Sequence, residues 1–223
     1  MDYSPYLMDD INGPQSGYAS DEILHVGRKP PKERADAARN RERIVEAAER
    51  LFAAHGVDAV SMDQIAAEAG VGKGTVFRRF GDKSGLAAEL LGAREAELQE
   101  AAIRGGPPLG PGAPAGARLV AFLRAYAEFL DANLDLVHMS ETASAGARYR
   151  IGAYAFWHQH VALLLREARP GGDADLFAHL LLAPLAAEQR KALAGEFSLS
   201  RLSDGVAALA ALVVTGDDRA DEL

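Results

Sequence analysis

Basic and hydroxyl side chains gather between Ser61 and Lys83, and their residue types suit contact with a polyanion. The second half of this stretch, KGTVFRRF, predicts a short helix with Val76 and Phe80 turned inward. Its outer side would carry four hydrogen-bond donors: Lys73, Thr75, Arg78 and Arg79. Lysine donates to phosphate oxygens, and arginine also matches the paired acceptors of guanine. The chemistry indicated here is nucleic-acid binding.

The residues just before this helix predict how it is positioned. Ser61 stands three residues before Gln64, which is the spacing of a capping box at the start of a helix. Apolar residues then recur at helical spacing, and Gly70 and Gly72 provide the turn. Two short helices joined by a tight turn, the second one basic, form the helix-turn-helix arrangement that enters a major groove.

The chain carries no set of residues typical of catalysis, so we expect that it is not an enzyme. It has no cysteine and no nucleophile-elbow pentapeptide, and GVGKGT at 70–75 lacks the spacing of a phosphate-binding loop. His158 and His160 are two residues apart and face different sides of a helix, which is poor spacing for metal ligands. We expect no metal and no cofactor.

Composition favours an all-α protein with one or two domains. The chain has 223 residues, 48% of them hydrophobic, and alanine and leucine outnumber β-branched residues. No apolar run approaches a membrane span, and the first residues lack the features of a signal peptide, so we expect a cytoplasmic protein that does not contact a membrane. The net charge is −8, yet residues 28–83 carry +3, so a basic domain stands on an acidic remainder.

A flexible extension and two domains are predicted along the chain. Residues 1–33 read as a flexible extension, in which Arg28, Lys29 and Lys32 are either a minor-groove arm or a solvated linker. Residues 34–83 read as a three-helix domain, whose first helix runs from about Asp36 to His55. Residues 84–223 read as a larger helical domain, in which the Pro/Gly-rich residues 105–116 form a loop.

The run RERIVEAAERLFAAHGVDAVSMDQIAAEAGVGKGTVFRRFGDKSGLAAELL resembles the DNA-binding domain of the TetR family of bacterial transcriptional regulators. The resemblance covers roughly residues 40–91. It implies an all-α homodimer with an N-terminal DNA-binding domain and a larger C-terminal ligand-binding and dimerisation domain. Phe77 and Arg79 depart from the Tyr and the His or Tyr that are usual in the family. The DNA-binding residues predicted are Arg39, Ser61, Met62, Lys73, Gly74, Thr75, Phe77, Arg78, Arg79 and Lys83.

The C-terminal domain holds the candidates for a ligand pocket. Pockets for small molecules are mostly apolar with a few placed polar groups, although aromatic residues at helical spacing are more often ordinary core. The predicted lining is Phe122, Tyr126, Phe129, Met139, Tyr154, Trp157 and His158. Beyond it, 174–193 predicts a helix that Pro184 kinks or splits, and 200–215 predicts a helix rich in small residues. The resemblance implies that these last helices pair with those of a second subunit.

Together these patterns predict a homodimeric regulator that binds double-stranded DNA. We expect a repressor that a small, mostly apolar effector releases from a near-palindromic operator. Two alternatives stay open: a ligand-blind DNA-binding protein, which a fully packed C-terminal domain would favour, and a regulator controlled by a protein partner.

Overall fold

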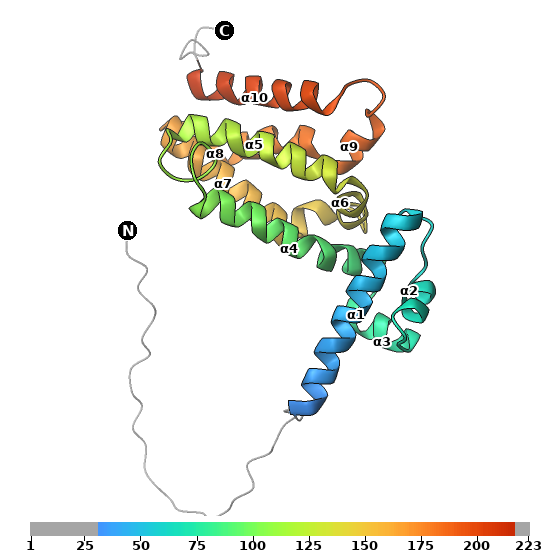
Figure 1. Cartoon of the computed structure of the whole chain (residues 1–223). Coiled ribbons are helices and arrows are strands. Elements are labelled where there is room, and N and C mark those ends of the chain that lie inside the picture. Colours follow the sequence, from blue (N-terminus) through green and yellow to red (C-terminus); the bar gives the residue numbers. More distant parts are fainter. Residues whose placement is uncertain (1–30, 217–223) are drawn as a thin grey trace, which may run out of the picture.

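The computed structural model describes residues 31–216, whose regular elements are all helices, without a strand. Figure 1 shows a small N-terminal head formed by α1–α3 and a larger body that begins with α4. Residues 1–30 of the predicted extension, including Arg28 and Lys29, and residues 217–223 lie outside the described residues. The helices are α1 Pro31–His55, α2 Met62–Glu68, α3 Lys73–Phe80, α4 Lys83–Arg104, α5 Ala115–Ala132, α6 Leu134–Glu141, α7 Gly152–Ala168, α8 Ala174–Leu182, α9 Ala187–Ala192 and α10 Leu199–Thr215, with 3-10 turns η1 Ala147–Arg150 and η2 Ala183–Leu185.

The first helix is longer than the sequence predicts. It begins at Pro31, about five residues before Asp36, so the last three residues of the predicted flexible extension belong to it. Proline is tolerated in the first helical turn because its missing N–H has no intrahelical partner there. Lys32 therefore lies on a helix rather than in an extended arm. The N-terminal half of α1 projects beyond α2 and α3 in Figure 1.

The head is closed around a core of its own. Ile44, Ile65, Val76 and Leu86 come from α1, α2, α3 and α4 in turn, and each is fully buried. Burying each side chain of this size stabilises the folded state by roughly 1.5–3 kcal/mol. Because the four side chains pack in one cluster, they hold the four helices together. Gly56 and Gly70 have φ of 80° and 62°, and they end α1 and α2 in the left-handed region that glycine adopts without strain.

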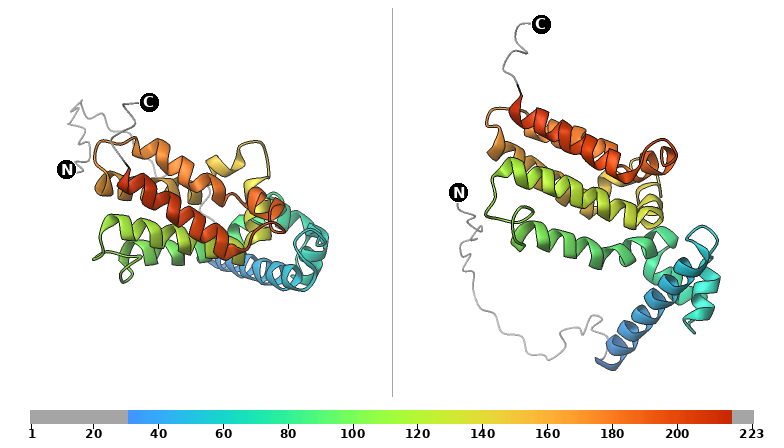
Figure 2. Two further views of the ribbon diagram at one scale, coloured as in Figure 1. Left: turned by 90° about the horizontal axis from the view of Figure 1, so that it is seen from above. Right: turned by 45° about the horizontal axis from the view of Figure 1, so that its top comes forward.

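The body is a stack of helices with α10 on the side farthest from the head (Figures 1 and 2). The α5 helix lies at its centre and packs against both α7 and α10, while α8 packs on α7. Leu119, Phe122, Leu123 and Leu130 of α5 are fully buried. As predicted, the chain breaks at Pro184, where η2 separates α8 from α9. The α6 helix was not predicted, because LDLVHMSE is short and follows α5 after the single residue Asn133.

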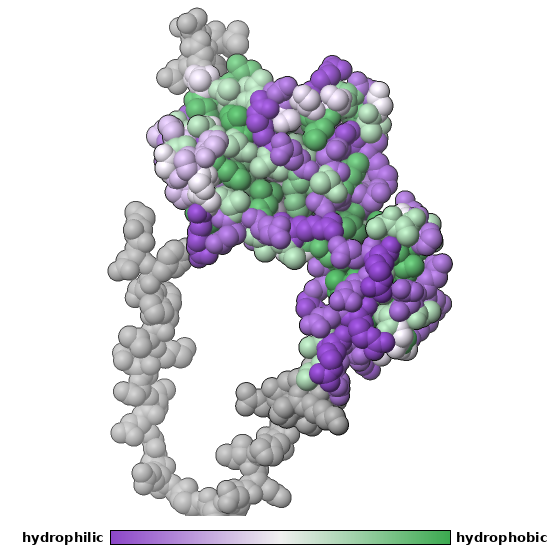
Figure 3. Space-filling view, in the orientation of Figure 1, coloured by the Kyte–Doolittle hydropathy of each residue, from purple (hydrophilic) through white to green (hydrophobic). Residues whose placement is uncertain are grey.

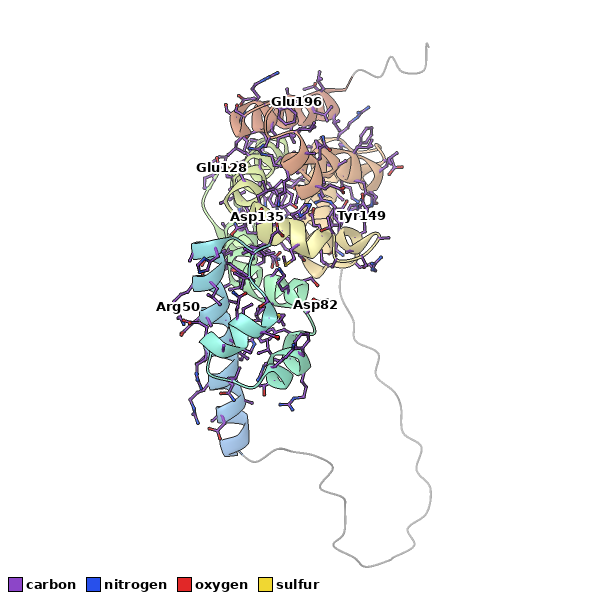
Figure 4. The ribbon with its side chains drawn as sticks, turned by 90° about the vertical axis from the view of Figure 1, so that its right-hand side faces the viewer. Arg50, Asp82, Glu128, Asp135, Tyr149 and Glu196 are labelled. Atoms are coloured by element: carbon purple, nitrogen blue, oxygen red, sulfur yellow. The ribbon has the colours of Figure 1, made fainter. Side chains whose placement is uncertain are left out.

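Polar contacts join the head to the body. The Arg94 guanidinium on α4 donates to a Glu49 carboxylate oxygen on α1 at 2.8 Å and to the Asn133 side-chain oxygen between α5 and α6 at 2.5 Å. Asp135 lies at the same junction, as Figure 4 shows, and accepts from the Lys191 ammonium of α9 at 2.9 Å. The first helix of the head is thus linked through α4 to the middle of the body.

Candidate functional site

The predicted capping box at the start of α2 is present. The Ser61 hydroxyl accepts from the Gln64 amide at 3.2 Å, and the Gln64 side-chain oxygen accepts from the Ser61 amide at 2.8 Å. These two bonds satisfy amides that the helix leaves without partners and fix where α2 begins. Met62, the first residue of α2, is only 7% exposed and packs into the head core. Its side chain is therefore unavailable to DNA, which corrects the prediction for Met62; only its backbone amide could serve.

The α3 helix presents an open, basic face. Its first turn has no side-chain cap at Gly72, and Lys73, Gly74, Phe77 and Arg78 are exposed. Val76 on the opposite side is fully buried, so the orientation of α3 is set by the core. A helix start with free amides and no Cβ at Gly74 permits close approach to a phosphate backbone. Hydrophilic residues cover most of the head surface in Figure 3.

Four of the five predicted DNA-binding cations already have partners inside the head: Lys83, described below, and three on α1 and α3. The Lys73 ammonium lies 2.7 Å from an Asp63 carboxylate oxygen and 5.6 Å from the centre of the Phe77 ring. The Arg79 guanidinium donates to the Ala37 carbonyl of α1 at 2.6 Å. Arg39 pairs with Asp36 one turn away. Arg79 therefore ties α3 to the first helix, which the sequence did not reveal because the two positions are 42 residues apart.

Lys83 holds the start of α4 against the head. Its ammonium donates to the Val57 carbonyl at 3.0 Å and to the Asp58 carbonyl at 3.3 Å. The neighbouring Asp82 caps α4 by accepting from the Gly85 amide at 3.0 Å. Hydrogen bonds from the Ser84 hydroxyl and then the Gly85 amide lower the pKa of Asp82, so the cap stays ionised. One donor of Lys83 remains for an external phosphate.

The predicted ligand-binding residues separate into three places. Phe122, Tyr126, Phe129 and Trp157 form one ring cluster, in which neighbouring centroids lie 5.4–6.3 Å apart. Tyr154 and His158 lie apart from this cluster and face α8, while Met139 packs against the head core. The seven residues therefore do not line a single pocket. Helical spacing could not show this, because it identifies the apolar face of a helix but not the element against which that face packs.

The ring cluster is tightly packed. Phe122, Tyr126 and Trp157 are at most 2% exposed, and burial raises the pKa of the Tyr126 hydroxyl. Beside it, Arg148 pairs with Glu141 and donates to the Leu182 carbonyl at 3.0 Å, while Glu141 accepts from the Ala187 amide at 2.9 Å. This buried pair is satisfied on several sides, as burial of charge requires. The pair links α6 and η1 to the end of α8 and the start of α9.

Tyr154 and His158 take part in a polar aromatic group on the α7–α8 side. The Tyr154 hydroxyl lies 2.7 Å from His179 Nδ1, and the His158 and His179 rings are 4.0 Å apart. Burial and the charge of His158 lower the pKa of His179, since two imidazolium rings so close would repel. Within residues 31–216 no group of three or more acidic or histidine side chains is arranged to hold a metal ion.

Two hollows lie where the head meets the body. A groove of about 810 Å³ is bordered by Ser61 and Lys73 of the head and by His138 and Met139 of α6. A second hollow of about 410 Å³ is bordered by Glu49, Arg94 and Asn133. Neither is lined by Phe122, Tyr126 or Trp157. Among the described helices, none is long and apolar enough to cross a membrane.

Comparisons with known proteins agree with this geometry. Residues 44–90 match the family model of bacterial regulatory proteins of the tetR family. An HTH-type transcriptional regulator of Staphylococcus aureus strain USA300 is 53% identical over 53 residues, which are 24% of this chain and 29% of that regulator. The sequence match to these curated relatives thus spans less than a third of their length.

Solved structures extend the likeness to the body. A TetR-like transcriptional regulator from Rhodococcus sp. RHA1 superimposes over 80% of this chain and 97% of its own, with a TM-score of 0.55 and 22% identity. A regulator from Saccharomonospora viridis in complex with choline covers 77% of this chain and 95% of its own, with a TM-score of 0.55 and 24% identity. At these identities the likeness shows the fold.

A helix-turn-helix head with a basic third helix, carried on a larger helical body, defines the class of helix-turn-helix regulators. Over residues 44–90 the head matches the DNA-binding domain of the TetR family of bacterial regulatory proteins, and the body shares the fold of TetR-like regulators. Members of the family are DNA-binding transcription factors and not enzymes.

Proposed function

We propose that this chain is a homodimeric transcriptional regulator that reads DNA with α3 and acts as a repressor. The exposed face of α3 is the observation that carries the proposal: Lys73, Gly74, Phe77 and Arg78 are exposed, Thr75 beside them is half-buried, and Val76 on the other side is in the core. Two such helices related by a two-fold axis would enter successive major grooves, so the operator would be near-palindromic, with half-sites about 34 Å apart.

The surface of the second subunit would be the outer face of α8 and α10. Leu176 and Leu180 of α8 are each 51% exposed, and Leu209 and Leu212 of α10 are 41% and 68% exposed. The two helices contact each other, and Pro184, Gly205 and Leu209 border a shallow apolar hollow of about 300 Å³ at this face. Exposed leucines gathered on adjoining helices are typical of a surface that a partner covers. In a two-fold dimer the same surface of a second copy of the chain would cover these leucines.

Control by a small molecule is supported by the link from body to head. The α4 helix has Lys83 at its head end and packs against α5 and α6 of the body, so a ligand that moves the body would move the head. The S. viridis relative holds choline, so this fold admits a small ligand. We propose a mostly apolar effector. The dense packing of Phe122, Tyr126 and Trp157 also favours a second candidate, a ligand-blind DNA-binding protein.

Selection from random duplex DNA tests the proposal without knowledge of the operator. The purified chain should enrich a near-palindromic motif whose half-sites are about one helical turn apart. Enrichment of no motif over the starting library at low salt would contradict sequence-specific DNA binding. Light scattering of the same preparation should give a dimer mass, and Leu212→Glu should give a monomer.

A further inference from the structure

Two polar groups inside the body lack the partners that buried polar groups normally have. The Nε of Arg118 in α5 and the Nε2 of His160 in α7 are both inaccessible to solvent, and neither has a hydrogen-bond partner within residues 31–216. His160 is only 7% exposed. Buried nitrogen atoms are almost always hydrogen-bonded, so two unpaired ones on neighbouring helices call for a specific acceptor.

The surroundings of His160 are aromatic. Its ring lies 4.8 Å from the Phe122 ring and 5.8 Å from the Phe156 ring, with which it stacks at 7°. Burial, and then the nearby positive charge of Arg118, lower the pKa of His160 to about 4. The imidazole is therefore neutral near pH 7, and its remaining N–H can be placed on Nε2.

The positive charge of Arg118 is poorly compensated. Within the described residues its guanidinium makes one long hydrogen bond, from Nη2 to the Ala102 carbonyl at 3.4 Å. Ala102 lies in the last turn of α4, where helix carbonyls lack intrahelical partners. By contrast, the other arginine with an unpaired buried nitrogen, Arg190, has an Asp131 carboxylate at 2.7 Å.

A guanidinium and an imidazole N–H form a donor pair for an anion, and a carboxylate matches two such donors with its two oxygens. The Phe122 and Phe156 rings beside them suit an apolar or aromatic group on the same molecule. A cationic ligand would be repelled by Arg118. We propose that Arg118 and His160 bind the carboxylate group of a small, mostly apolar organic acid inside the body.

This inference rests on the proposed function, because it gives the chemical class of the effector. The acid would compete for the Arg118 guanidinium, whose Nη2 donates the long hydrogen bond to the Ala102 carbonyl near the body end of α4. The opposite end of α4 begins at Lys83, which is bonded to the head. Occupancy of the site would therefore change a contact at one end of the helix that connects the body to the DNA-binding head.

Phenylacetate is a suitable probe, with phenylacetamide as its neutral match. Trp157 is the only tryptophan of the chain and lies 5.8 Å from Phe122, so its fluorescence reports events at this site. Titration of the full chain with millimolar phenylacetate should change the fluorescence saturably and raise the melting temperature, while phenylacetamide should do neither. Arg118→Met and His160→Leu should each weaken phenylacetate binding about tenfold or more.

Arg124→Met is the matched control, because Arg124 lies on the same helix and only forms an exposed ion pair with Asp204 at 2.8 Å. It should bind phenylacetate like the parent chain. Equal binding of acid and amide, or unchanged binding in folded Arg118→Met, would overturn the proposal. So would the absence of any saturable change with phenylacetate, benzoate and octanoate. Selection of duplex DNA by Arg118→Met separates the two proposals, because DNA binding should persist there even if the acid site does not exist.

Discussion

The ammonium of Lys73, the first residue of α3, lies 2.7 Å from a carboxylate oxygen of Asp63 in α2. Both side chains are about 60% exposed, so this ion pair stabilises the free protein little. For the proposed DNA binding the pair matters, because the Lys73 ammonium must leave Asp63 or share its donors to reach a phosphate.

Asp63→Asn should therefore strengthen DNA binding severalfold at low salt, because it frees Lys73 and removes a negative charge from the face that meets phosphate. Fluorescence anisotropy with a labelled duplex measures this. Asp204→Asn makes the same change in charge on α10, far from the head, and should leave the affinity nearly unchanged. Weaker binding by Asp63→Asn would show that the Asp63 carboxylate is needed to orient Lys73.

Ser61→Ala should lower the free energy of unfolding by about 1 kcal/mol. The change removes the hydroxyl that accepts from the Gln64 amide at 3.2 Å and leaves that amide without its cap. Guanidinium denaturation followed by circular dichroism gives the difference. Ser200→Ala is the matched control, because the Ser200 hydroxyl only contacts Asp204 at 3.4 Å within α10. Equal stability of both variants would mean that the cap contributes nothing.

Arg94→Met should destabilise the junction of head and body by about 1–3 kcal/mol. It removes the donor at 2.5 Å from the Asn133 side-chain oxygen, and Asn133 is only 8% exposed, so a buried acceptor loses its partner. Thermal unfolding measures the loss. Arg104→Met on the same helix removes an exposed pair with Glu100 and should cost less than about 1 kcal/mol. A loss no greater than that of Arg104→Met would contradict a role for Arg94 in holding the two parts together.

Local features of this fold were predictable from the sequence, and long-range contacts were not. The Ser61 cap, the turn at Gly70 and the break at Pro184 depend on a few neighbouring residues, so their residue types suffice. The bonds from Arg79 to Ala37 and from Arg94 to Asn133 join positions 42 and 39 residues apart, and no spacing rule pairs them. Helical periodicity identifies an apolar face but not what that face contacts. It therefore could not show that Met62 packs in the head core or that Phe122 packs in the ring cluster.

The buried His160 makes stability depend on pH. Its pKa falls from 6.5 in the unfolded chain to about 4 in the folded one, mainly through burial and also through the charge of Arg118. Between these values the unfolded chain binds more protons, so stability should fall as pH falls from about 6.5 to 4, by up to about 3 kcal/mol.

His160→Leu should flatten this part of the profile in urea unfolding measured at several pH values. His55→Gln changes an exposed histidine and should keep the parent profile. A slope that is as steep in His160→Leu as in the parent would assign the pH dependence to other groups.

Reading of DNA by α3 is tested most directly by the affinity of Arg78→Ala for the selected duplex and for a scrambled duplex of equal length. Arg78 is exposed on α3, so its loss should cost binding without costing stability. We predict a loss of about 1–3 kcal/mol on the selected duplex and a smaller loss on the scrambled one. Arg104→Ala, an equally exposed arginine in the last turn of α4, should bind both duplexes as the parent does. Parent-like binding of both duplexes by Arg78→Ala would contradict base reading by Arg78. Equal losses of affinity on the two duplexes would show that Arg78 contacts only the phosphate backbone.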